Sequence, residues 1–318
     1  MPHSLPPVAI PSATIAGLEK PVSKLVMGVD NQNAYEPAAA LYDAYLAAGG
    51  NTFDTAHIYG KLRSRLLGRW VRERGARDRV VIIAKGIHSP RCEPRWIRPE
   101  LEEQLGWLGM DHADLYLMHR DNPEVAVGDF VEALNEQVRA GRIRLFGASN
   151  WTIERVQAAN DYAARHRLQG LSALSNCLAL ADMPRVIWPG CLQAHDMATR
   201  RWLEYTQMPL FSWSSQAKAF FVPGRAAPDK TDDANMVRTW YSADNFERRR
   251  RAFALAEEKG VEPIHIALAW VLKQPFPSFP IIGPRTLQHL FSSLRALEVA
   301  LSDEEWRWLD LLDDEPPR

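Results

Sequence analysis

Apolar residues along the chain alternate between two spacings, one typical of buried strands and one typical of helices. Short apolar runs, such as 80–84, are followed by stretches in which apolar residues recur every three or four positions, such as 153–166. A continuous short apolar run indicates a strand covered on both faces, and the longer period indicates an amphipathic helix. The alternation repeats along the chain from residue 24 onward. We therefore expect a series of strand–helix units.

The expected strands span 24–28, 51–54, 79–85, 114–119, 143–149, 171–176, 209–213 and 279–283. The expected helices span 36–48, 64–74, 99–108, 130–140, 153–166, 199–207, 245–259, 263–273, 287–297 and 302–312. Ser302 and Glu305 have the spacing of a capping box at the start of the last helix. Residues 1–22 are rich in proline and are expected to form an irregular or hairpin-like lead-in, and 217–245 a long surface loop.

Eight strands alternating with helices, with no compositional break that would mark a linker, favour one α/β domain over residues 1–318. The predicted fold is a single (β/α)8 TIM barrel with a short N-terminal lead-in and an extra C-terminal helix, and 217–245 is expected at its mouth. The alternative is an open doubly wound sheet. That fold usually carries G-x-G-x-x-G after its first strand, whereas this chain continues Gly28-Val29-Asp30-Asn31-Gln32.

Composition narrows the class of partner. The chain has 318 residues, of which 38 are basic and 39 acidic, for a net charge of -1. This balance gives no electrostatic reason to expect nucleic acid or an anionic membrane as partner. No run approaches the roughly 18 apolar residues of a membrane span, and residues 1–13 do not resemble a secretory signal. Cys92, Cys177 and Cys191 are widely spaced, which fits a reducing compartment. We expect a cytoplasmic protein that binds a small molecule.

Candidate chemistry lies at the ends of three consecutive expected strands. Asp54, Lys85 and His119 end these strands, and Tyr59 follows the first of them. Strand C-termini converge at one mouth of a barrel, where sites are built. Each residue alone also has a simple structural explanation, such as a solvated lysine or a packed tyrosine. Together they are coherent, because an ammonium lowers the pKa of a phenol, normally about 10, and a carboxylate holds the ammonium. Such a group suits proton donation to a carbonyl oxygen when the carbonyl carbon accepts hydride.

Four segments in order resemble the aldo-keto reductase superfamily. They are Phe53-Asp54-Thr55-Ala56 with Tyr59-Gly60, then Ala84-Lys85-Gly86, then 115–120, then Gly147-Ala148-Ser149-Asn150-Trp151. The resemblance implies a TIM barrel that binds NADPH/NADP+, with NADH as the alternative, and reduces an aldehyde or ketone. It also implies that Tyr59 is the general acid, that Lys85 lowers its pKa, that Asp54 holds Lys85, and that His119 orients the carbonyl.

The resemblance further implies a set of cofactor contacts. Ser149 and Asn150 would bind the nicotinamide carboxamide, Trp213 would stack on its ring, and Ser175 stands where the family usually has glutamine. Arg285 would pair with a 2′-phosphate, which favours NADP, although Ser292 and Ser293 replace the usual acid and amide. The full set is Gly28, Ser149, Asn150, Ser175, Trp213, Ser214, Gln216, Lys218, Gly283, Arg285 and His289.

Asp30, His88 and Trp151 are the expected substrate wall, and its polar members favour a hydroxylated or sugar-like carbonyl compound. Two other functions are compatible with the same residues. One is a sugar or polyol dehydrogenase that works in the oxidising direction, and the other is a cofactor-binding regulatory subunit with little turnover. No metal site is predicted, because Asp114 and His119 lie five apart on a strand and point to opposite faces.

Overall fold

Seven parallel strands form one curved sheet in the computed structural model, which describes residues 8–317. Their spatial order is β8-β7-β6-β5-β4-β3-β9, so neighbours in the chain are also neighbours in the sheet from β3 to β8. The strands are β3 (Val26–Gly28), β4 (Thr52–Asp54), β5 (Val81–Gly86), β6 (Ala113–Met118), β7 (Ile143–Ser149), β8 (Leu174–Ser175) and β9 (Ile281–Ile282).

The expected strand at 209–213 closes the ring through isolated bridges instead of a continuous ladder. Leu210 is bridged to Leu174 on one side and to Ser278 on the other, both in parallel orientation. The N–H of Phe211 donates to the carbonyl of Leu174, and the N–H of Phe279 donates to that of Leu210, both at 2.8 Å. This segment therefore fills the position between β8 and β9, and the expected (β/α)8 fold is confirmed.

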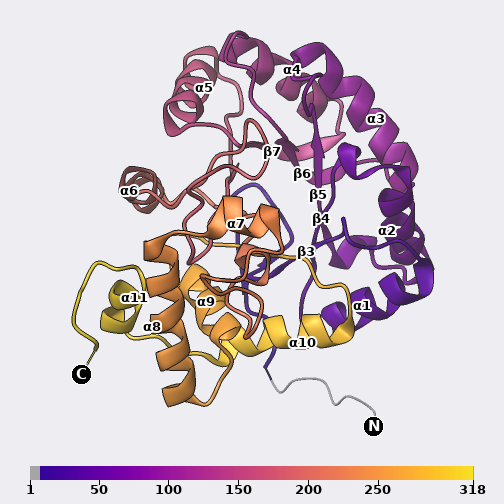
Figure 1. Ribbon diagram of the computed structural model, residues 1–318. Coiled ribbons are helices and arrows are strands. Elements are labelled where there is room, and N and C mark those ends of the chain that lie inside the picture. The colour runs from indigo at the N-terminus through magenta and orange to yellow at the C-terminus, as the bar shows by residue number, and fades with distance from the viewer. Residues whose placement is uncertain (1–7, 318) are drawn as a thin grey trace.

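Helices surround the sheet, and α1 to α5 each follow a strand and form an outer layer around β3 to β7 (Figure 1). The helices are α1 (Tyr35–Ala47), α2 (Lys61–Glu73), α3 (Ile97–Leu108), α4 (Val127–Arg139), α5 (Ile153–His166), α6 (Met197–Thr206), α7 (Ala234–Trp240), α8 (Ala243–Lys259), α9 (Pro263–Leu272), α10 (Leu287–Arg295) and α11 (Asp303–Leu309). The capping box predicted for Ser302 and Glu305 is present at the start of α11. No helix within residues 8–317 is long and apolar enough to cross a membrane.

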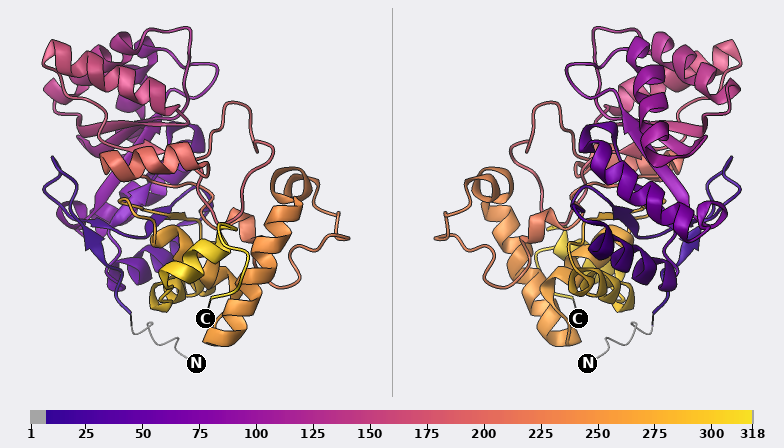
Figure 2. Two further views of the ribbon diagram at one scale, coloured as in Figure 1. Left: turned by 90° about the vertical axis from the view of Figure 1, so that its left-hand side faces the viewer. Right: turned by 90° about the vertical axis from the view of Figure 1, so that its right-hand side faces the viewer.

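The structure differs from the loop expected over 217–245. Helix α7 forms within it, and α8 begins at Ala243, so only the first half is irregular. Asp233 caps α7 by accepting from the N–H of Met236, and Phe220 and Phe221 are fully buried. Helix α7 has only seven residues and, unlike α11, lies in a stretch with no clean apolar period and no recognised capping box, which explains the missed element. Figure 2 shows α7 and α8 standing out from the side of the barrel.

Apolar side chains fill the barrel interior and leave only its C-terminal end for a site. They come from successive strands and form one buried cluster: Val26, Val81, Ile83, Leu115, Leu117, Leu145, Ala173, Phe211 and Phe279. The antiparallel pair β1 (Ser12–Ala13) and β2 (Val22–Ser23) precedes the barrel, and Ile15 between them packs on this cluster. The described part of the lead-in is therefore a hairpin, and residues 1–7 lie outside the described range.

Candidate active site

The strand period of two places three polar side chains directly above the apolar interior. Ile83 and Leu117 point into the barrel. Lys85 and His119 come two positions later, so they also point inward, one layer nearer the C-terminal end of the strands. Asp54 is in register with Ile83, and Lys85 with Leu117. The three side chains are buried, with exposed fractions of 2% for Asp54, 2% for Lys85 and 9% for His119. The structure thus brings together the residues that the sequence analysis selected.

Asp54 and Lys85 form a buried ion pair. The Lys85 Nζ donates to Asp54 Oδ2 at 2.8 Å. Burial alone would lower the pKa of Lys85, but the charges of Asp54 and Tyr59 outweigh it and hold that pKa above its ordinary value. Burial raises the pKa of Asp54, and the Lys85 ammonium opposes this rise. Lys85 therefore stays charged at neutral pH because Asp54 is beside it.

Tyr59 lies at the end of the 3-10 turn η1 (His57–Tyr59), which follows β4. The Lys85 Nζ is 5.5 Å from the centroid of its ring, and the His119 ring is 6.0 Å away at a nearly perpendicular angle. Burial raises the pKa of Tyr59 to about 12, although Lys85 acts to lower it. Lys85 has the predicted effect on the phenol, but burial is the stronger one. The phenol is therefore protonated throughout the neutral range.

His119 is held as a neutral imidazole. Burial lowers its pKa well below the ordinary value, and the positive charges of Lys85 and Arg120 and nearby His88 act in the same direction. The His88 ring lies 5.0 Å from it. Nδ1 of His119 is buried and has no hydrogen-bond partner within residues 8–317. A neutral imidazole can hydrogen-bond a substrate oxygen without adding a charge to the site.

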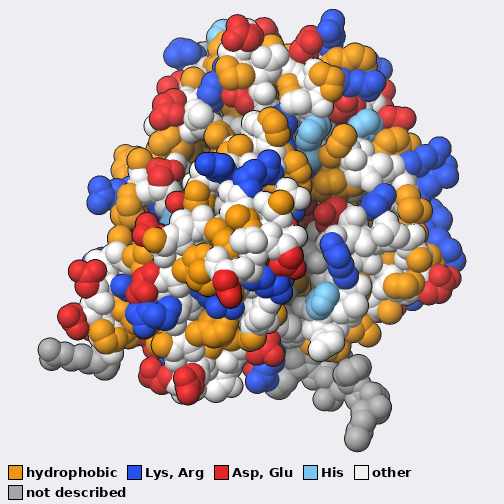
Figure 3. All heavy atoms as spheres, viewed as in Figure 1, with side chains coloured by type: hydrophobic (Ala, Val, Ile, Leu, Met, Phe, Trp, Pro, Cys, Tyr) orange, Lys and Arg blue, Asp and Glu red, His pale blue; other side chains and the backbone are white. Residues whose placement is uncertain are grey.

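These residues lie in one large cavity at the C-terminal end of the strands. Its volume is about 2560 Å³. Ordinary small-molecule sites measure roughly 300–1,000 Å³, so a dinucleotide and a second molecule fit together. On the face shown in Figure 3, acidic, basic and histidine side chains surround the hollow. All four candidate catalytic residues are among its lining residues.

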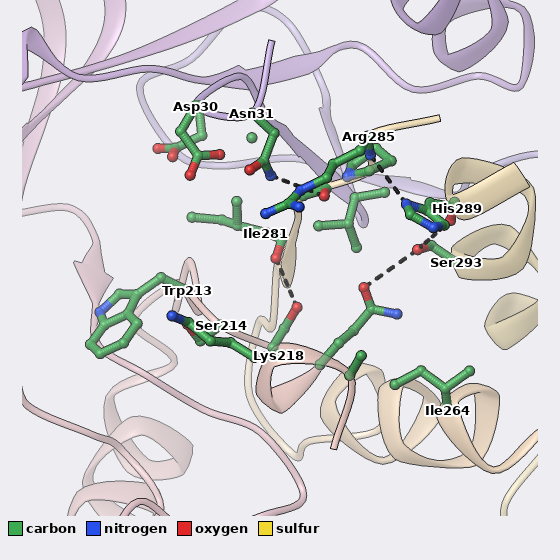
Figure 4. A pocket seen from close by; sticks show the side chains of 18 of the residues that line it. Asp30, Asn31, Trp213, Ser214, Lys218, Ile264, Ile281, Arg285, His289 and Ser293 are labelled. Carbon is green, nitrogen blue, oxygen red and sulfur yellow. Dashed lines mark hydrogen bonds between the residues drawn. The ribbon is translucent and has the colours of Figure 1, made fainter. Parts of the chain in front are cut away.

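Most of the expected cofactor residues line the same cavity. They are Gly28, Ser149, Asn150, Trp213, Ser214, Gln216, Lys218, Gly283, Arg285 and His289, several of which appear in Figure 4. Ser175 does not line it, because its side chain is fully buried. Its carbonyl accepts a hydrogen bond from Ser149 Oγ at 2.7 Å. Ser175 therefore acts on Ser149 through its backbone and presents no side chain to the cavity.

Asn150 uses its side chain to fix neighbouring segments. Its Nδ2 donates to the His119 carbonyl at 3.1 Å and to Ser149 Oγ at 3.0 Å, and its Oδ1 accepts from the Leu192 N–H at 3.0 Å. Both amide hydrogens are thus engaged within the protein. Its backbone is left-handed, with φ of 60°, a conformation that asparagine tolerates better than most residues. These contacts tie the ends of β6 and β7 to the 188–192 segment.

The turn at 214–219 contains unusual backbone conformations. Ser214, Ala217, Lys218 and Ala219 have φ of 51°, 46°, 50° and 69°. Each such non-glycine residue costs on the order of 1–3 kcal/mol, and strain of this kind collects at functional sites. Hydrogen bonds hold the turn in place: Ser215 Oγ donates to the Ile281 carbonyl at 2.8 Å, and Gln216 Oε1 accepts from Ser293 Oγ at 3.5 Å.

The N-terminus of α10 lies across the cavity from the 214–219 turn (Figure 4). Thr286 caps the helix by accepting from the His289 N–H at 3.2 Å. Asn31 Nδ2 donates to the Gly283 carbonyl at 3.1 Å and so links the loop after β3 to this segment. Arg285 has no acidic partner within ion-pair distance among residues 8–317. A free guanidinium beside a helix N-terminus suits an anion.

The substrate side agrees only in part with expectation. Asp30 and His88 line the cavity, but Trp151 does not, because its side chain is fully buried. Trp151 packs edge-on against Phe130 and donates from Nε1 to the Arg120 carbonyl at 3.3 Å. It follows Asn150 at a strand end, so the sequence alone could not show that its ring turns inward to the core.

Several cavity residues were not selected from the sequence, among them Ile58, Trp188 and Arg120. Ile58 and Trp188 are 55% and 51% exposed, and Arg120 is buried. Ile58 and Arg120 are adjacent to Tyr59 and His119 in the chain, and that adjacency was the available signal. Trp188 lies in an irregular segment with no period, so no sequence signal distinguished it from the other tryptophans.

Comparison with known proteins agrees with this geometry. The sequence profile of the Aldo/keto reductase family matches residues 24–314. The chain belongs to this family. It is 28% identical over 313 residues to the "Uncharacterized oxidoreductase YrpG" of Bacillus subtilis, with 91% of each chain covered. It is 29% identical to the norsolorinic acid reductase stcV of Emericella nidulans, covering 85% of this chain and 70% of that protein. It is 25% identical to Protein tas of Escherichia coli, covering 89% and 92%.

Proposed function

We propose that this family member is an NAD(P)H-dependent reductase of an aldehyde or ketone, in which Tyr59 is the proton donor. The observation that carries the proposal is the meeting of Tyr59, Lys85, Asp54 and His119 in one cavity. Asp54, Lys85 and His119 come from the ends of β4, β5 and β6, and Tyr59 from the turn η1 after β4. Tyr59 holds its proton at neutral pH, since its pKa is about 12, and is thus ready to donate.

Each of the four residues has a distinct task in this proposal. Tyr59 donates its phenolic proton to the carbonyl oxygen as negative charge develops there. Lys85 stabilises the resulting phenolate, and Asp54 keeps Lys85 charged and in place through their 2.8 Å contact. Neutral His119 fixes the carbonyl oxygen by a hydrogen bond. Because the ion pair has no net charge, the site provides an ammonium without the full cost of an isolated buried cation.

The residues around the cavity fit a nicotinamide dinucleotide, which when bound supplies the hydride. Members of the family generally use NAD(P)H. We propose that Trp213 packs against the nicotinamide and that the 214–219 turn holds the pyrophosphate near Lys218. Arg285, unpaired within the described chain, would hold a 2′-phosphate, which favours NADPH over NADH. Asn150 would act mainly by positioning Ser149, because its own amide is engaged.

The wall around Tyr59 is mixed in character. Asp30 and His88 supply the polar groups that favoured a sugar-like substrate, but Ile58 and Trp188 line the same cavity as exposed apolar side chains. The name of one relative, norsolorinic acid reductase, states that that protein reduces norsolorinic acid. We propose a carbonyl substrate with an apolar part and a polar part.

Steady-state oxidation of NADPH with a carbonyl panel tests the proposal. We expect turnover by the wild type and loss of turnover in Tyr59→Phe, while NADPH still quenches tryptophan fluorescence in both. The matched control is Tyr205→Phe, because Tyr205 is 90% exposed on α6 and lies outside the cavity. It should behave as the wild type does.

Two results would contradict the proposal in different ways. Near-wild-type turnover by Tyr59→Phe would show that another group donates the proton. Tight NADPH binding without turnover of any carbonyl would favour a cofactor-binding regulatory protein instead of an enzyme.

A further inference from the structure

Arg120 is a buried cation in the cavity with almost no protein partner. It follows His119 directly, is 5% exposed and is one of the cavity-lining residues. Its Nη1 donates to the His119 carbonyl at 3.1 Å. Its Nε is buried without an acceptor, and no carboxylate within residues 8–317 lies within ion-pair distance of the guanidinium. A buried charge without a counter-charge is costly unless a ligand supplies one.

The other buried arginines show what this one lacks. Four arginines are buried among the described residues: Arg120, Arg200, Arg248 and Arg251. Arg200 pairs with Asp310 at 2.6 Å and Arg251 with Glu247 at 2.7 Å. Arg248 lies in the field of Asp310, Asp182 and Asp244. Of the four, Arg120 alone lines the cavity.

Asp121 and Glu100, whose charges act together with that of Arg120 on the Cys92 thiol, are already engaged by other groups. Asp121, the neighbour of Arg120 in the chain, accepts two hydrogen bonds from Arg155, at 3.0 and 2.9 Å. Glu100 is buried and accepts from the Ile87 N–H at 2.6 Å. Neither can move to Arg120 without leaving its own partner unsatisfied. The missing counter-charge therefore has to come from outside the described chain.

Arg120 lies on the side of the cavity that the turn 188–191 forms. It borders His119 in the chain, and its side chain runs beneath the turn 188–191: a Cβ built on Gly190 would lie 3.6 Å from Arg120 Cδ. Trp188, Pro189 and Cys191 of this turn also line the cavity. The residues proposed for the cofactor phosphates, by contrast, come from the 214–219 turn and the start of α10.

We propose that Arg120 binds a carboxylate of the substrate, so that the preferred substrates are aldehydes or ketones that carry an acid group. This inference rests on the proposed carbonyl reductase function and names its substrate class. A guanidinium is a planar group of N–H donors that suits a carboxylate. Nε is buried, so the donor offered to a ligand is Nη2, which has no acceptor within residues 8–317. Ile58 and Trp188 would cover the apolar part of the same molecule.

The test compares each acid with its neutral counterpart. The substrates are 2-, 3- and 4-carboxybenzaldehyde and their methyl esters, assayed with NADPH. In the wild type we expect kcat/KM for at least one acid to exceed that for its ester by roughly tenfold or more. Arg120→Met keeps most of the stem and should reduce this ratio to near one, mainly through KM for the acid. Arg120→Lys should retain part of the preference.

Controls separate this role from general damage and from cofactor binding. The acid-to-ester ratio is internal to each variant, so a partly damaged protein still gives a valid value. Arg295→Met removes another cavity-lining arginine, one that is paired with Glu298 at 2.7 Å, and should keep the wild-type ratio. If Arg120→Met instead weakened NADPH binding and left the ratio unchanged, Arg120 would bind a cofactor phosphate and the proposal would be wrong.

The outcomes also separate this inference from the proposed function. Esters reduced as fast as all three acids by the wild type would overturn the carboxylate site while supporting carbonyl reduction. If neither acids nor esters were reduced, the proposed function would fail. Titration of benzoate would then judge Arg120 alone: binding by the wild type that weakens at least tenfold in Arg120→Met would retain the anion site, and equal binding would overturn it.

Discussion

Asp54→Asn tests how strongly the site depends on its buried ion pair. The change keeps the shape of the side chain but removes the carboxylate that Lys85 contacts at 2.8 Å. At an effective dielectric constant of about 20, the attraction at this distance is about 6 kcal/mol before the cost of desolvation. Removing one partner of a buried pair typically costs about 3–5 kcal/mol.

The pKa of Lys85 leads to a similar value for the loss of unfolding free energy. Without Asp54, burial would drive the pKa of Lys85 below its ordinary value of 10.5. If Lys85 escaped the penalty by losing its proton at pH 7, the cost relative to an ordinary lysine would be about 5 kcal/mol. We therefore expect Asp54→Asn to lower the free energy of unfolding by about 3–5 kcal/mol.

Thermal unfolding followed by circular dichroism measures this loss. A change of this size should lower the midpoint by about 5–7 °C. Asp303→Asn is the matched control, because Asp303 contacts Lys273 at the same 2.8 Å but is 92% exposed. Solvent screens such a surface pair, so its removal should leave the midpoint close to that of the wild type.

The pH dependence gives an independent check. In the wild type the folded-state pKa of Lys85 is raised, so its stabilising contribution is complete below pH 10.5 and is lost as pH rises through the higher folded value. In Asp54→Asn the pKa should fall, and turnover should decline at a lower alkaline pH than in the wild type. The reasoning fails if Asp54→Asn unfolds at the same midpoint as Asp303→Asn and shows an unchanged alkaline limb.

Three further predictions concern the proton donor and the scaffold. Because the pKa of Tyr59 is about 12, alcohol oxidation should accelerate with pH from 7 to 10 while carbonyl reduction changes little; initial rates in both directions measure this, and parallel profiles would contradict it. Gly147→Ala should destabilise the barrel by about 1–3 kcal/mol in urea unfolding, because a Cβ there would lie 2.2 Å from the Ala173 carbonyl oxygen; wild-type stability would refute this close approach. Ser302→Ala should cost about 1 kcal/mol through loss of the α11 cap, whereas Ser302→Thr should retain most of it.

The sequence predicted the barrel well because its strands and helices differ strongly in hydrophobic period. Residues 153–166 were expected as a helix and form α5 with those limits. The period missed helix α7, which has seven residues in a stretch without a clean apolar pattern. The strand expected at 209–213 is in place, but isolated bridges from Leu210 to Leu174 and Ser278 hold it there instead of a continuous ladder.

In the candidate site, too, the sequence predicted one part and missed another. The positions of Asp54, Lys85 and His119 follow from strand periodicity, which the sequence displays. The environment of each group does not follow from it. Arg120 stands next to Asp121 in the sequence, but in the structure Arg155 holds that carboxylate. Trp151 looked like a cavity wall, and its ring turns into the core.

Burial explains why Asp54, Tyr59 and Lys85 have to work as a unit. Taken separately, burial raises the pKa of Tyr59, lowers that of Lys85 and raises that of Asp54, so each group alone would tend toward its neutral form. The Asp54–Lys85 contact reverses this for the lysine and leaves an ammonium near a phenol that is still protonated. Such a phenol cannot release its proton to water at neutral pH, because water does not stabilise the phenolate there. It can release it to an oxygen held beside it, since Lys85 then stabilises the phenolate at the moment it forms. The same burial that makes Tyr59 a weak acid in the resting protein thus confines its proton transfer to the bound carbonyl.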